Sequence, residues 1–383
     1  MQNLISKNVE NIEISGIRKF YNKVVNYPEA VSLTLGQPDF SVPNAVKEAM
    51  ISAIQLNKTV YTANAGISEL RTEISNYLKN MNINYSPNEV CVTVGGSEGL
   101  LCVFTALINE EDKILIPTPA YPAYESCVKL LGGKVINYNL NRSFSLDFEN
   151  IETIITKEKP KAIVLSFPCN PTGAALTKED KEKLFNILKD KDITIITDEI
   201  YSALNYREKY YSIAQYEELL NKTILVSGFS KMLSMTGLRV GYVCAKDEYM
   251  KHIMKVHQYG VSCAPSIGQY GALEGLKSCK EDIEDMKQEF KNRRDYLYGA
   301  LINLGFECVK PDGAFYIFPS IEKFGMNSEE FCERLLKEAK VAIVPGSAFG
   351  TGGEGYIRIS YSYSMQELIE GISRISKWIK QFN

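Results

Sequence analysis

The sequence predicts an α/β protein in which a mostly parallel β-sheet carries helices on both faces and is joined to a smaller α+β domain. Seven short β-rich runs alternate with helix-period segments through the middle of the chain. Such alternation produces parallel strands that are covered by helices. After about residue 280 the pattern changes to a long charged helix followed by short strands. The length of 383 residues leaves room for both units.

The seven strand candidates are short runs rich in apolar and β-branched residues. They cover residues 91–94, 113–116, 134–138, 162–167, 194–197, 223–227 and 240–244. Segments with a helical period lie between them, at residues 97–107, 123–131, 177–189 and 213–220. In a sheet of this kind ligands bind at the carboxyl ends of the strands, so the residues that follow each strand are the candidates for chemistry.

The C-terminal unit is predicted to be α+β. A charged helix covers residues 281–304, and short strands follow at residues 315–318, 342–345 and 355–360. The last helix begins at Ser364, where Glu367 completes a capping box. Its apolar stripe consists of Leu368, Ile372, Ile375 and Ile379.

We expect the C-terminal unit to pack with the N-terminal arm. The predicted division is a large domain over residues 45–280 and a small domain built from residues 1–44 and 281–383.

Composition excludes several classes of protein. The 43 basic and 46 acidic residues give a net charge of −3, which argues against a nucleic-acid-binding protein. The first sixteen residues lack a basic segment followed by an apolar one, so we expect no secretory signal. No run of about 18 apolar residues occurs, so we expect no membrane span.

The cysteines and histidines favour a cytoplasmic protein without a metal site. Nine cysteines are scattered from Cys91 to Cys332 without a C-x-x-C pair, a pattern that suits reduced thiols. The two histidines, His252 and His257, are too few for most metal or Ser-His-Asp sites. We interpret His257 as structural.

The strongest local signal is Lys231, in the run Ser227-Gly-Phe-Ser-Lys231 that follows a strand. A lysine at the carboxyl edge of a parallel sheet is partly desolvated, and desolvation favours the free amine that attacks a carbonyl group. The alternative is a solvated surface lysine, which is the usual state of this residue type.

Two more strand exits carry polar residues. Asn170 stands between prolines in an irregular turn that ends at Gly173. Asp198 closes an apolar strand and precedes Glu-Ile-Tyr201, and a carboxylate there is costly unless it is paired. Its alternative role is an ordinary helix N-cap.

The segment from Gly95 to Gly99 follows a strand and opens a helix, so its free N–H groups and the helix dipole form an anion site suited to phosphate. The alternative is a tight turn. Arg239, eight residues after Lys231, can add a bidentate phosphate contact. The aromatic run at residues 314–318 indicates first a buried strand and second a pocket wall.

Taken together, these residues resemble the class I, fold-type I pyridoxal-phosphate (PLP) aminotransferases. The resemblance runs from Gly36-Gln-Pro-Asp to Arg358-Ile-Ser, with Asn-Pro-Thr-Gly, Asp-Glu-x-Tyr and Ser-Lys in order between them. Within the family the chain looks closest to the PatA-type enzymes, which include aspartate-like and N-acetyl-LL-2,6-diaminopimelate aminotransferases.

The resemblance implies the following roles around the cofactor ring. Lys231 binds PLP covalently, and Asp198 pairs with the pyridine nitrogen. Asn170 and Tyr201 bond the phenolic oxygen, and Tyr121 stacks on the ring. Lys231, Asp198 and Tyr201 are the implied catalytic residues.

For the cofactor's phosphate, the resemblance implies a set of backbone and side-chain donors. They are the N–H groups of Gly96, Ser97 and Glu98 with the side chains of Ser230 and Arg239. Many relatives have Ser or Thr three residues before the lysine, where this chain has Gly228, and Ser227 lies one step earlier. Whether Ser227 replaces that contact is left open.

For the substrate, Arg358 resembles the arginine that forks onto the α-carboxylate, with Gly36, Tyr121 and Asn170 beside it. Tyr61 resembles the tyrosine that reaches a neighbouring subunit's phosphate, which implies a homodimer.

The implied reaction is ping-pong transfer of an amino group from an L-amino acid to a 2-oxo acid such as 2-oxoglutarate. The alternatives are a carbon–sulfur β-lyase of the same fold and a non-catalytic PLP-binding regulator.

Overall fold

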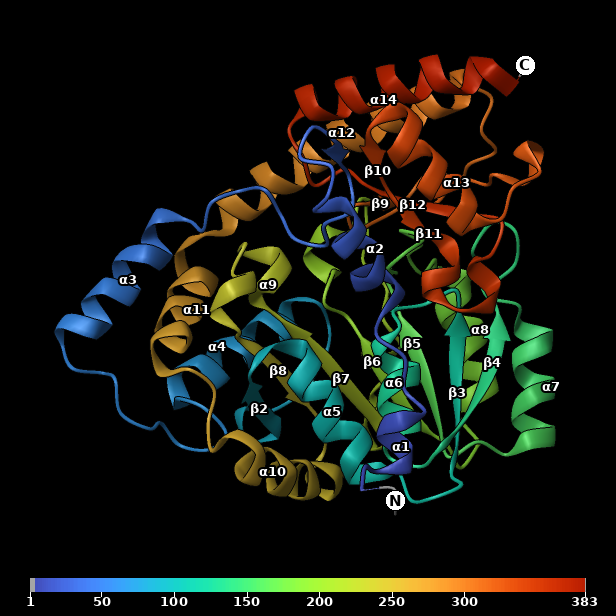
Figure 1. Ribbon diagram of the computed structural model, residues 1–383. Helices are drawn as coiled ribbons and strands as arrows, with labels where there is room; N and C mark the ends of the chain where they lie inside the picture. Colours follow the sequence, from blue (N-terminus) through green and yellow to red (C-terminus); the bar gives the residue numbers. More distant parts are fainter. Residues whose placement is uncertain (1–3, 383) are drawn as a thin grey trace.

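The computed structural model describes residues 4–382, which form a large sheet with its helices and a smaller C-terminal part above it (Figure 1). Residues 1–3 and 383, which fall in the predicted small domain, lie outside the described residues. Among the described helices, none has the length and apolar character needed to cross a membrane.

The large sheet has seven strands, and all seven predicted runs are confirmed. The strands are β2 (Val90–Thr93), β3 (Lys113–Thr118), β4 (Lys134–Asn139), β5 (Ala162–Ser166), β6 (Thr194–Asp198), β7 (Thr223–Gly228) and β8 (Gly241–Cys244). Their order in the sheet is β2-β8-β7-β6-β5-β3-β4. Only β8 runs against its neighbours, so the predicted mostly parallel sheet is confirmed.

Helices cover both faces of this sheet, which explains why β5, β6 and β7 are buried along their whole length. One face packs against α5 (Gly95–Leu107), α6 (Ala123–Leu130) and α10 (Asp247–Val261). The other packs against α3 (Asn44–Gln55), α4 (Ser68–Asn80), α7 (Phe148–Glu158), α8 (Lys178–Leu188) and α11 (Ser266–Ser278).

One predicted helix is wrong. Residues 213–220 form two short 3₁₀ turns, η3 (Ile213–Gln215) and η4 (Glu217–Lys222). Tyr216 between them has extended backbone angles (φ −93°, ψ 112°), which interrupt a helix. The apolar residues that suggested a helix, Ile213, Leu219 and Leu220, are nevertheless buried, because the two turns direct them toward the core.

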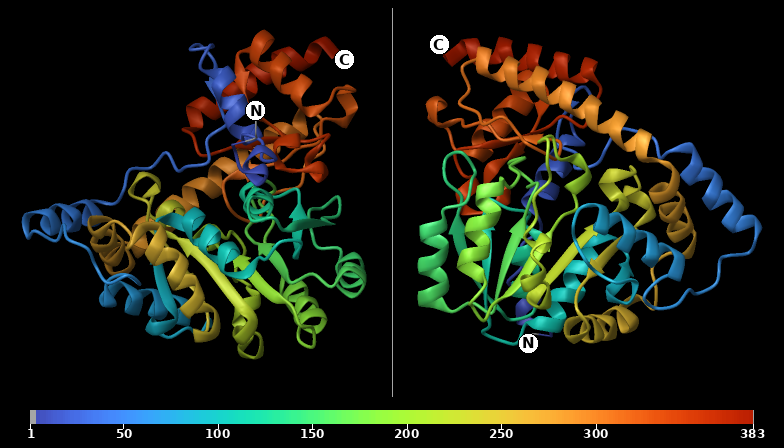
Figure 2. Two further views of the ribbon diagram at one scale, coloured as in Figure 1. Left: turned by 60° about the horizontal axis from the view of Figure 1, so that its bottom comes forward. Right: turned by 180° about the vertical axis from the view of Figure 1, so that it is seen from behind.

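The smaller part is built as predicted from a long helix, short strands and two further helices. Its elements are α12 (Lys280–Asn303), β9 (Tyr316–Ile317), α13 (Ser328–Arg334), β10 (Val341–Ala342), β11 (Val344–Pro345), β12 (Ile357–Ser360) and α14 (Met365–Ile379). Three of the strands form a sheet in the order β11-β12-β9. Figure 2 shows α12 running from the end of α11 into this part. The capping box of Ser364 and Glu367 at the start of α14 is confirmed.

The N-terminal arm joins this smaller part. β1 (Val31–Ser32) pairs in parallel with β10, and α2 (Gly16–Val24) contacts β11. The short helix α1 (Lys7–Glu10) precedes α2. These contacts support the proposed small domain, and its boundaries at residues 1–44 and 281–383 remain a prediction.

Candidate active site

A cavity of about 520 Å³ lies at the carboxyl ends of the central strands and is closed by residues of the smaller part and the N-terminal arm. Of the thirteen site residues predicted from the sequence, eleven line this cavity. They are Gly36, Gly96, Ser97, Tyr121, Asn170, Asp198, Tyr201, Ser230, Lys231, Arg239 and Arg358. The two exceptions are Glu98 and Tyr61.

Lys231 lies in α9 (Phe229–Met232), the single turn that follows β7. Its ammonium group donates a hydrogen bond to the backbone oxygen of Gly36. Burial, followed by the positive charges of Arg239 and Arg358, lowers the pKa of Lys231 to about 8. About a tenth of this side chain is therefore the free amine at pH 7, and about half at pH 8.

Asp198 is the last residue of β6 and is buried. Its carboxylate accepts hydrogen bonds from the Tyr124 hydroxyl (2.7 Å) and from the N–H of Ile200 (3.1 Å). Burial raises the pKa of Asp198, and the bond from Tyr124 opposes that rise. No helix begins at this residue, so the N-cap alternative does not apply. Asp198 is therefore a buried hydrogen-bond acceptor that faces the cavity.

The sequence analysis missed Tyr124 as a member of this site. Its hydroxyl bonds Asp198 and lies 2.9 Å from Ser166 Oγ, and its ring makes an edge contact with Tyr121. The sequence carries a signal for this role, because Tyr124 is the second tyrosine of the run Pro-Ala-Tyr-Pro-Ala-Tyr that also contains Tyr121. Tyr124 is the second residue of α6, three residues after Tyr121.

Arg358 lies on β12, and its side chain is 1% exposed. One terminal nitrogen donates to Asn170 Oδ1 (3.0 Å) and the other to the Thr34 carbonyl oxygen (2.6 Å). The Nε–H group has no partner among the described residues. Both hydrogen-bond acceptors of the Arg358 guanidinium are neutral. The guanidinium is therefore a buried cation whose charge is not balanced, and it can bind an anion.

Aromatic rings enclose this arginine. Its guanidinium carbon lies 4.4 Å from the ring centre of Tyr316 and 4.9 Å from that of Phe349. The Tyr316 hydroxyl is 2.8 Å from the Tyr201 hydroxyl. The aromatic run at residues 314–318 therefore contains both a buried strand, β9, and a wall of the cavity.

The start of α5 has the geometry that suits an anion. Gly96 and Ser97 lie in the first turn, where backbone N–H groups have no partner inside the helix. Arg239 packs against this turn, because a Cβ placed on Gly95 would come within 2.5 Å of its Nη2. Gly95 also has a φ of +72°, which favours glycine. The cradle suits a phosphate group.

Close glycine contacts hold this cradle against the sheet. A Cβ on Gly241 of β8 would lie 2.6 Å from the backbone of Gly95 and Gly96. A Cβ on Gly228 of β7 would lie 2.8 Å from Gly241 Cα. A Ser or Thr therefore does not fit at position 228 without a shift of the backbone.

The side chain of Ser227 is not placed to make the phosphate contact that a Ser or Thr at position 228 would make. It is buried and does not line the cavity, and its hydroxyl donates to the Glu199 carbonyl oxygen (3.0 Å). The remaining candidates for a phosphate contact are Ser230, Arg239 and the start of α5.

The side chain of Glu98 faces away from the cavity. It accepts from the N–H of Val94 (3.0 Å) and lies 3.1 Å from Nδ1 of His257. The other ring nitrogen of His257 lies 3.0 Å from the Asn64 carbonyl oxygen. His257 is thus buried between two acceptors, as its structural interpretation predicts. With Cys102, Glu98 and His257 form a group whose ligand atoms lie within 4.8 Å of one another.

The fold and this cavity together define an α/β enzyme of fold-type I architecture, with an amine, a carboxylate and an anion cradle at the strand ends. Comparison with known proteins gives the family. Residues 28–375 match the model for aminotransferase class I and II. The chain belongs to this family and is an aminotransferase.

Similar proteins cover the whole length of the chain. A protein of Bacillus subtilis (strain 168) described as a probable N-acetyl-LL-diaminopimelate aminotransferase is 44% identical over 99% of this chain and 96% of its own. An aspartate aminotransferase of Pyrococcus abyssi (strain GE5 / Orsay) is 38% identical over 98% of both chains. The structure of the Thermus thermophilus aspartate aminotransferase with maleate matches with a TM-score of 0.93 and 31% identity, covering 98% of this chain and 100% of that one.

The glycine contact beneath the anion cradle gives a direct test. Gly241→Ala should lower the free energy of unfolding by about 1–3 kcal/mol and reduce aminotransferase kcat/KM, because the added methyl group pushes against the start of α5. Gly237→Ala is the matched control, since a Cβ there meets no atom within 4 Å. Equal stability and activity of the two variants would show that the contact does not position α5.

Proposed function

We propose that the protein is a PLP-dependent aminotransferase that transfers an amino group from an L-amino acid to a 2-oxo acid by a ping-pong mechanism, with 2-oxoglutarate as an acceptor. The observation that carries the proposal is the gathering of Lys231, Asp198 and the α5–Arg239 cradle around one cavity. Each of these groups matches a different part of the cofactor, and no simpler ligand uses all of them.

The residues present fit PLP. The first turn of α5, Ser230 and Arg239 would hold the phosphate. Asp198 forms no ion pair within residues 4–382, so its buried carboxylate can receive a protonated pyridine nitrogen. Lys231 would supply the covalent link. When bound, the cofactor supplies an electron sink that makes the α-proton of an amino acid acidic.

The protein's own groups would orient the substrate and move the proton. Arg358 presents a planar fork to the α-carboxylate, an arrangement that lysine does not reproduce. The Nζ atom of Lys231, with a pKa of about 8, can both accept and release a proton near neutral pH. Tyr201 and Tyr316 line the cavity beside these groups, and their hydroxyl oxygens lie 2.8 Å apart.

Within the class, we propose N-acetyl-LL-2,6-diaminopimelate, an intermediate of lysine synthesis, as the first donor to test, with aspartate second. The support is the descriptions of the two similar proteins, which name different substrates. The cytoplasmic location predicted from composition stays a prediction, and the structure contains all nine cysteines as free thiols.

The decisive experiment measures glutamate formed from 2-oxoglutarate with a panel of amino donors, including N-acetyl-diaminopimelate, aspartate and phenylalanine. The purified protein should form glutamate, and Lys231→Ala should lose both this activity and the borohydride-stable attachment of PLP. Lys209→Ala, an exposed lysine outside the cavity, is the control. Release of homocysteine, pyruvate and ammonia from cystathionine as the dominant activity would favour the β-lyase instead.

The pKa of Lys231 gives a pH-dependent prediction. The protonated ammonium cannot attack an aldehyde, so the rate of PLP attachment to cofactor-free protein should rise with pH and reach half its maximum near pH 8. Replacing Arg358 with Leu removes a positive neighbour and should move this midpoint upward. A midpoint near 10.5, the ordinary lysine value, would contradict the proposed environment.

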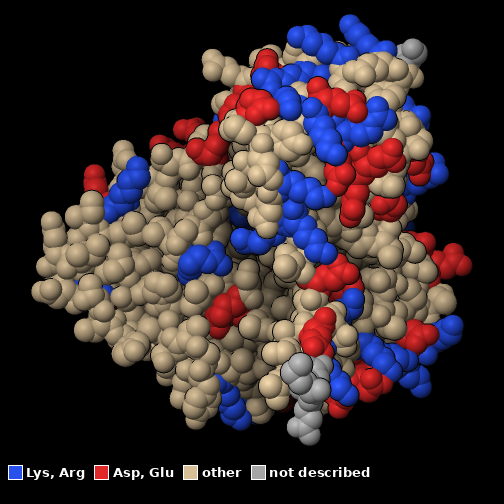
Figure 3. Space-filling model, viewed as in Figure 1, with Lys and Arg blue, Asp and Glu red and all other residues tan. Residues whose placement is uncertain are grey.

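We also propose a homodimer in which Tyr61 reaches the neighbouring subunit. The Tyr61 side chain is 84% exposed and does not line its own chain's cavity. It belongs to an exposed apolar stretch on α3 and the loop after it that includes Ile51, Ile54, Leu56 and Val60. Figure 3 shows few charged side chains over this side of the molecule, at the left. Such a patch is typical of a protein interface.

Light scattering tests the dimer. The holoenzyme should have twice the 43.0 kDa mass of the chain. Ile54→Asp should shift it toward the monomer, because the new carboxylate would be buried at the interface. Ile369→Asp, which changes an equally exposed isoleucine on α14, should leave the mass unchanged. A wild-type mass of 43.0 kDa would overturn this part of the proposal.

A further inference from the structure

The carboxylate of Asp198 receives its hydrogen bonds from neutral donors. Of the residues that the structure describes, only the Tyr124 hydroxyl and the N–H of Ile200 donate to it, one to each oxygen. Under the proposed function this carboxylate meets the ring nitrogen of PLP, and the two groups share one proton. The proton rests on the stronger base of the two, so the donors on Asp198 influence the state of the cofactor.

Tyr124 reaches Asp198 through a short chain of hydroxyl groups. It lies on α6, is 1% exposed, and its hydroxyl is 2.9 Å from Ser166 Oγ on β5. A tyrosine hydroxyl has one hydrogen to donate, and a carboxylate is a stronger acceptor than a serine oxygen. Ser166 can therefore donate to the Tyr124 oxygen while Tyr124 donates to Asp198. Hydrogen bonds in such a chain strengthen one another.

The surroundings keep Tyr124 a donor. Burial and the charge of Asp198 raise the pKa of Tyr124 well above its ordinary value, so the hydroxyl keeps its hydrogen near neutral pH. In return, the hydrogen bond from Tyr124 opposes the rise that burial causes in the pKa of Asp198. Asp198 is therefore a weaker base than burial alone would make it.

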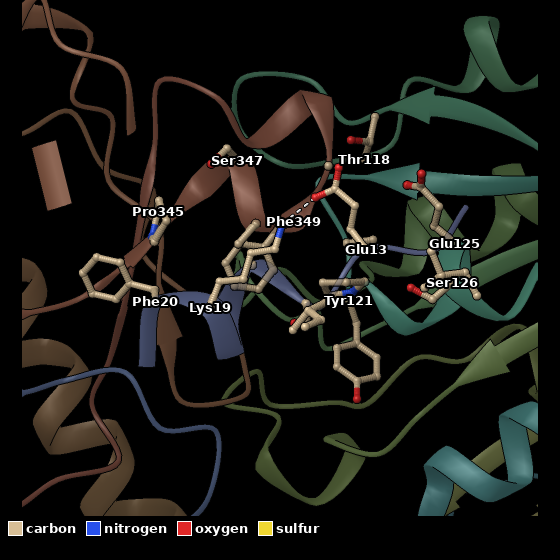
Figure 4. Close-up of a pocket in the computed structure, with 18 of the residues that line it drawn as sticks. Glu13, Lys19, Phe20, Thr118, Tyr121, Glu125, Ser126, Pro345, Ser347 and Phe349 are labelled. Atoms are coloured by element: carbon tan, nitrogen blue, oxygen red, sulfur yellow. Dashed lines mark hydrogen bonds and ion pairs between the residues drawn. The ribbon is translucent and has the colours of Figure 1, made fainter. Parts of the chain in front are cut away.

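The ring of Tyr124 has a separate role from its hydroxyl. Its centre lies 5.7 Å from that of Tyr121, with the planes at 85°, which is an edge contact. Tyr121 also lines a second cavity of about 470 Å³, but its ring points away from Glu13 and Lys19 of that cavity (Figure 4). A phenylalanine at position 124 would keep the edge contact with Tyr121 and remove only the hydrogen bond to Asp198.

We propose that Tyr124 is a positioning residue whose hydrogen bond orients the Asp198 carboxylate and keeps the shared proton on the ring nitrogen of the cofactor. The inference rests on the proposed function, because Asp198 meets a ring nitrogen only if PLP is bound. Without the hydrogen bond, the buried Asp198 would be the stronger base and would take the proton from the nitrogen. A neutral ring withdraws electrons less well, so the α-proton of the amino acid would be less acidic.

The position of the proton can be measured directly. The holoenzyme is prepared with PLP that carries the nitrogen-15 isotope in its ring, and the nitrogen resonance distinguishes a protonated from a neutral pyridine. The wild type should give the signal of the protonated form, and Tyr124→Phe should shift the signal toward the neutral form at the same pH. Ser166→Ala, which leaves Tyr124 in place, should give a smaller shift in the same direction.

The half-reaction with an amino acid gives a second readout. Its rate at saturating amino acid should fall about 10- to 100-fold in Tyr124→Phe, the usual effect of losing a hydrogen bond to a charged group. The amino-acid concentration that gives half the maximal rate should change less than about threefold, because Arg358 rather than Tyr124 is proposed to bind the substrate.

Tyr138→Phe is the matched control. Tyr138 is also buried, and its hydroxyl donates to the Val164 carbonyl oxygen (2.8 Å), but it does not line the cavity. The control thus removes a buried hydroxyl from the same sheet without touching Asp198. It should leave both the nitrogen signal and the rate of the half-reaction unchanged.

Three results would overturn the inference. They are a neutral nitrogen already in the wild type, the same protonated nitrogen in Tyr124→Phe whatever its rate, and equal effects of Tyr124→Phe and Tyr138→Phe. All three leave the proposed function standing, because the wild type still binds PLP and transaminates. Failure of the wild type to bind PLP, or to transaminate with every donor, would instead refute the proposed function.

Discussion

An excess of positive charge around a single carboxylate is the constraint on which the rest of this site depends. Lys231, Arg239 and Arg358 converge on the cavity that Asp198 faces. Taking such cations out of water is costly unless they are paired, and their mutual repulsion contributes to the lowered pKa of Lys231. The same imbalance of charge favours a ligand with several negative groups.

The fold supplies these groups from segments that are far apart in the sequence. Parallel strands bring Asn170, Asp198 and Lys231 to one edge of the sheet, whereas Arg358 comes from β12 of the smaller part. Arg358 also bonds Asn170 and the Thr34 carbonyl, so it ties both parts and the N-terminal arm together at the cavity. The group proposed to bind substrate is thus also a structural link, and its position depends on all three segments.

Much of this architecture was predictable because local sequence determines it. Each strand of the large sheet is an apolar run, and each polar residue that closes such a run must lie at the same edge. The helix predicted at residues 213–220 failed because apolar spacing alone does not show that Tyr216 is extended. Tyr124, hydrogen-bonded to Asp198, was missed because its partner is 74 residues away. The Ser227 hydroxyl donates to the Glu199 carbonyl oxygen, 28 residues away in the sequence, and only the assembled sheet reveals this contact.

The charged side chains that line the cavity differ in how firmly the fold holds them. Lys231, Asp198 and Arg239 are held by the packed sheet, where a change of one side chain disturbs many neighbours. Arg18 is exposed on a short helix of the N-terminal arm and has no partner in the rest of the described chain. A substitution there changes the charge at the edge of the cavity without repacking the core.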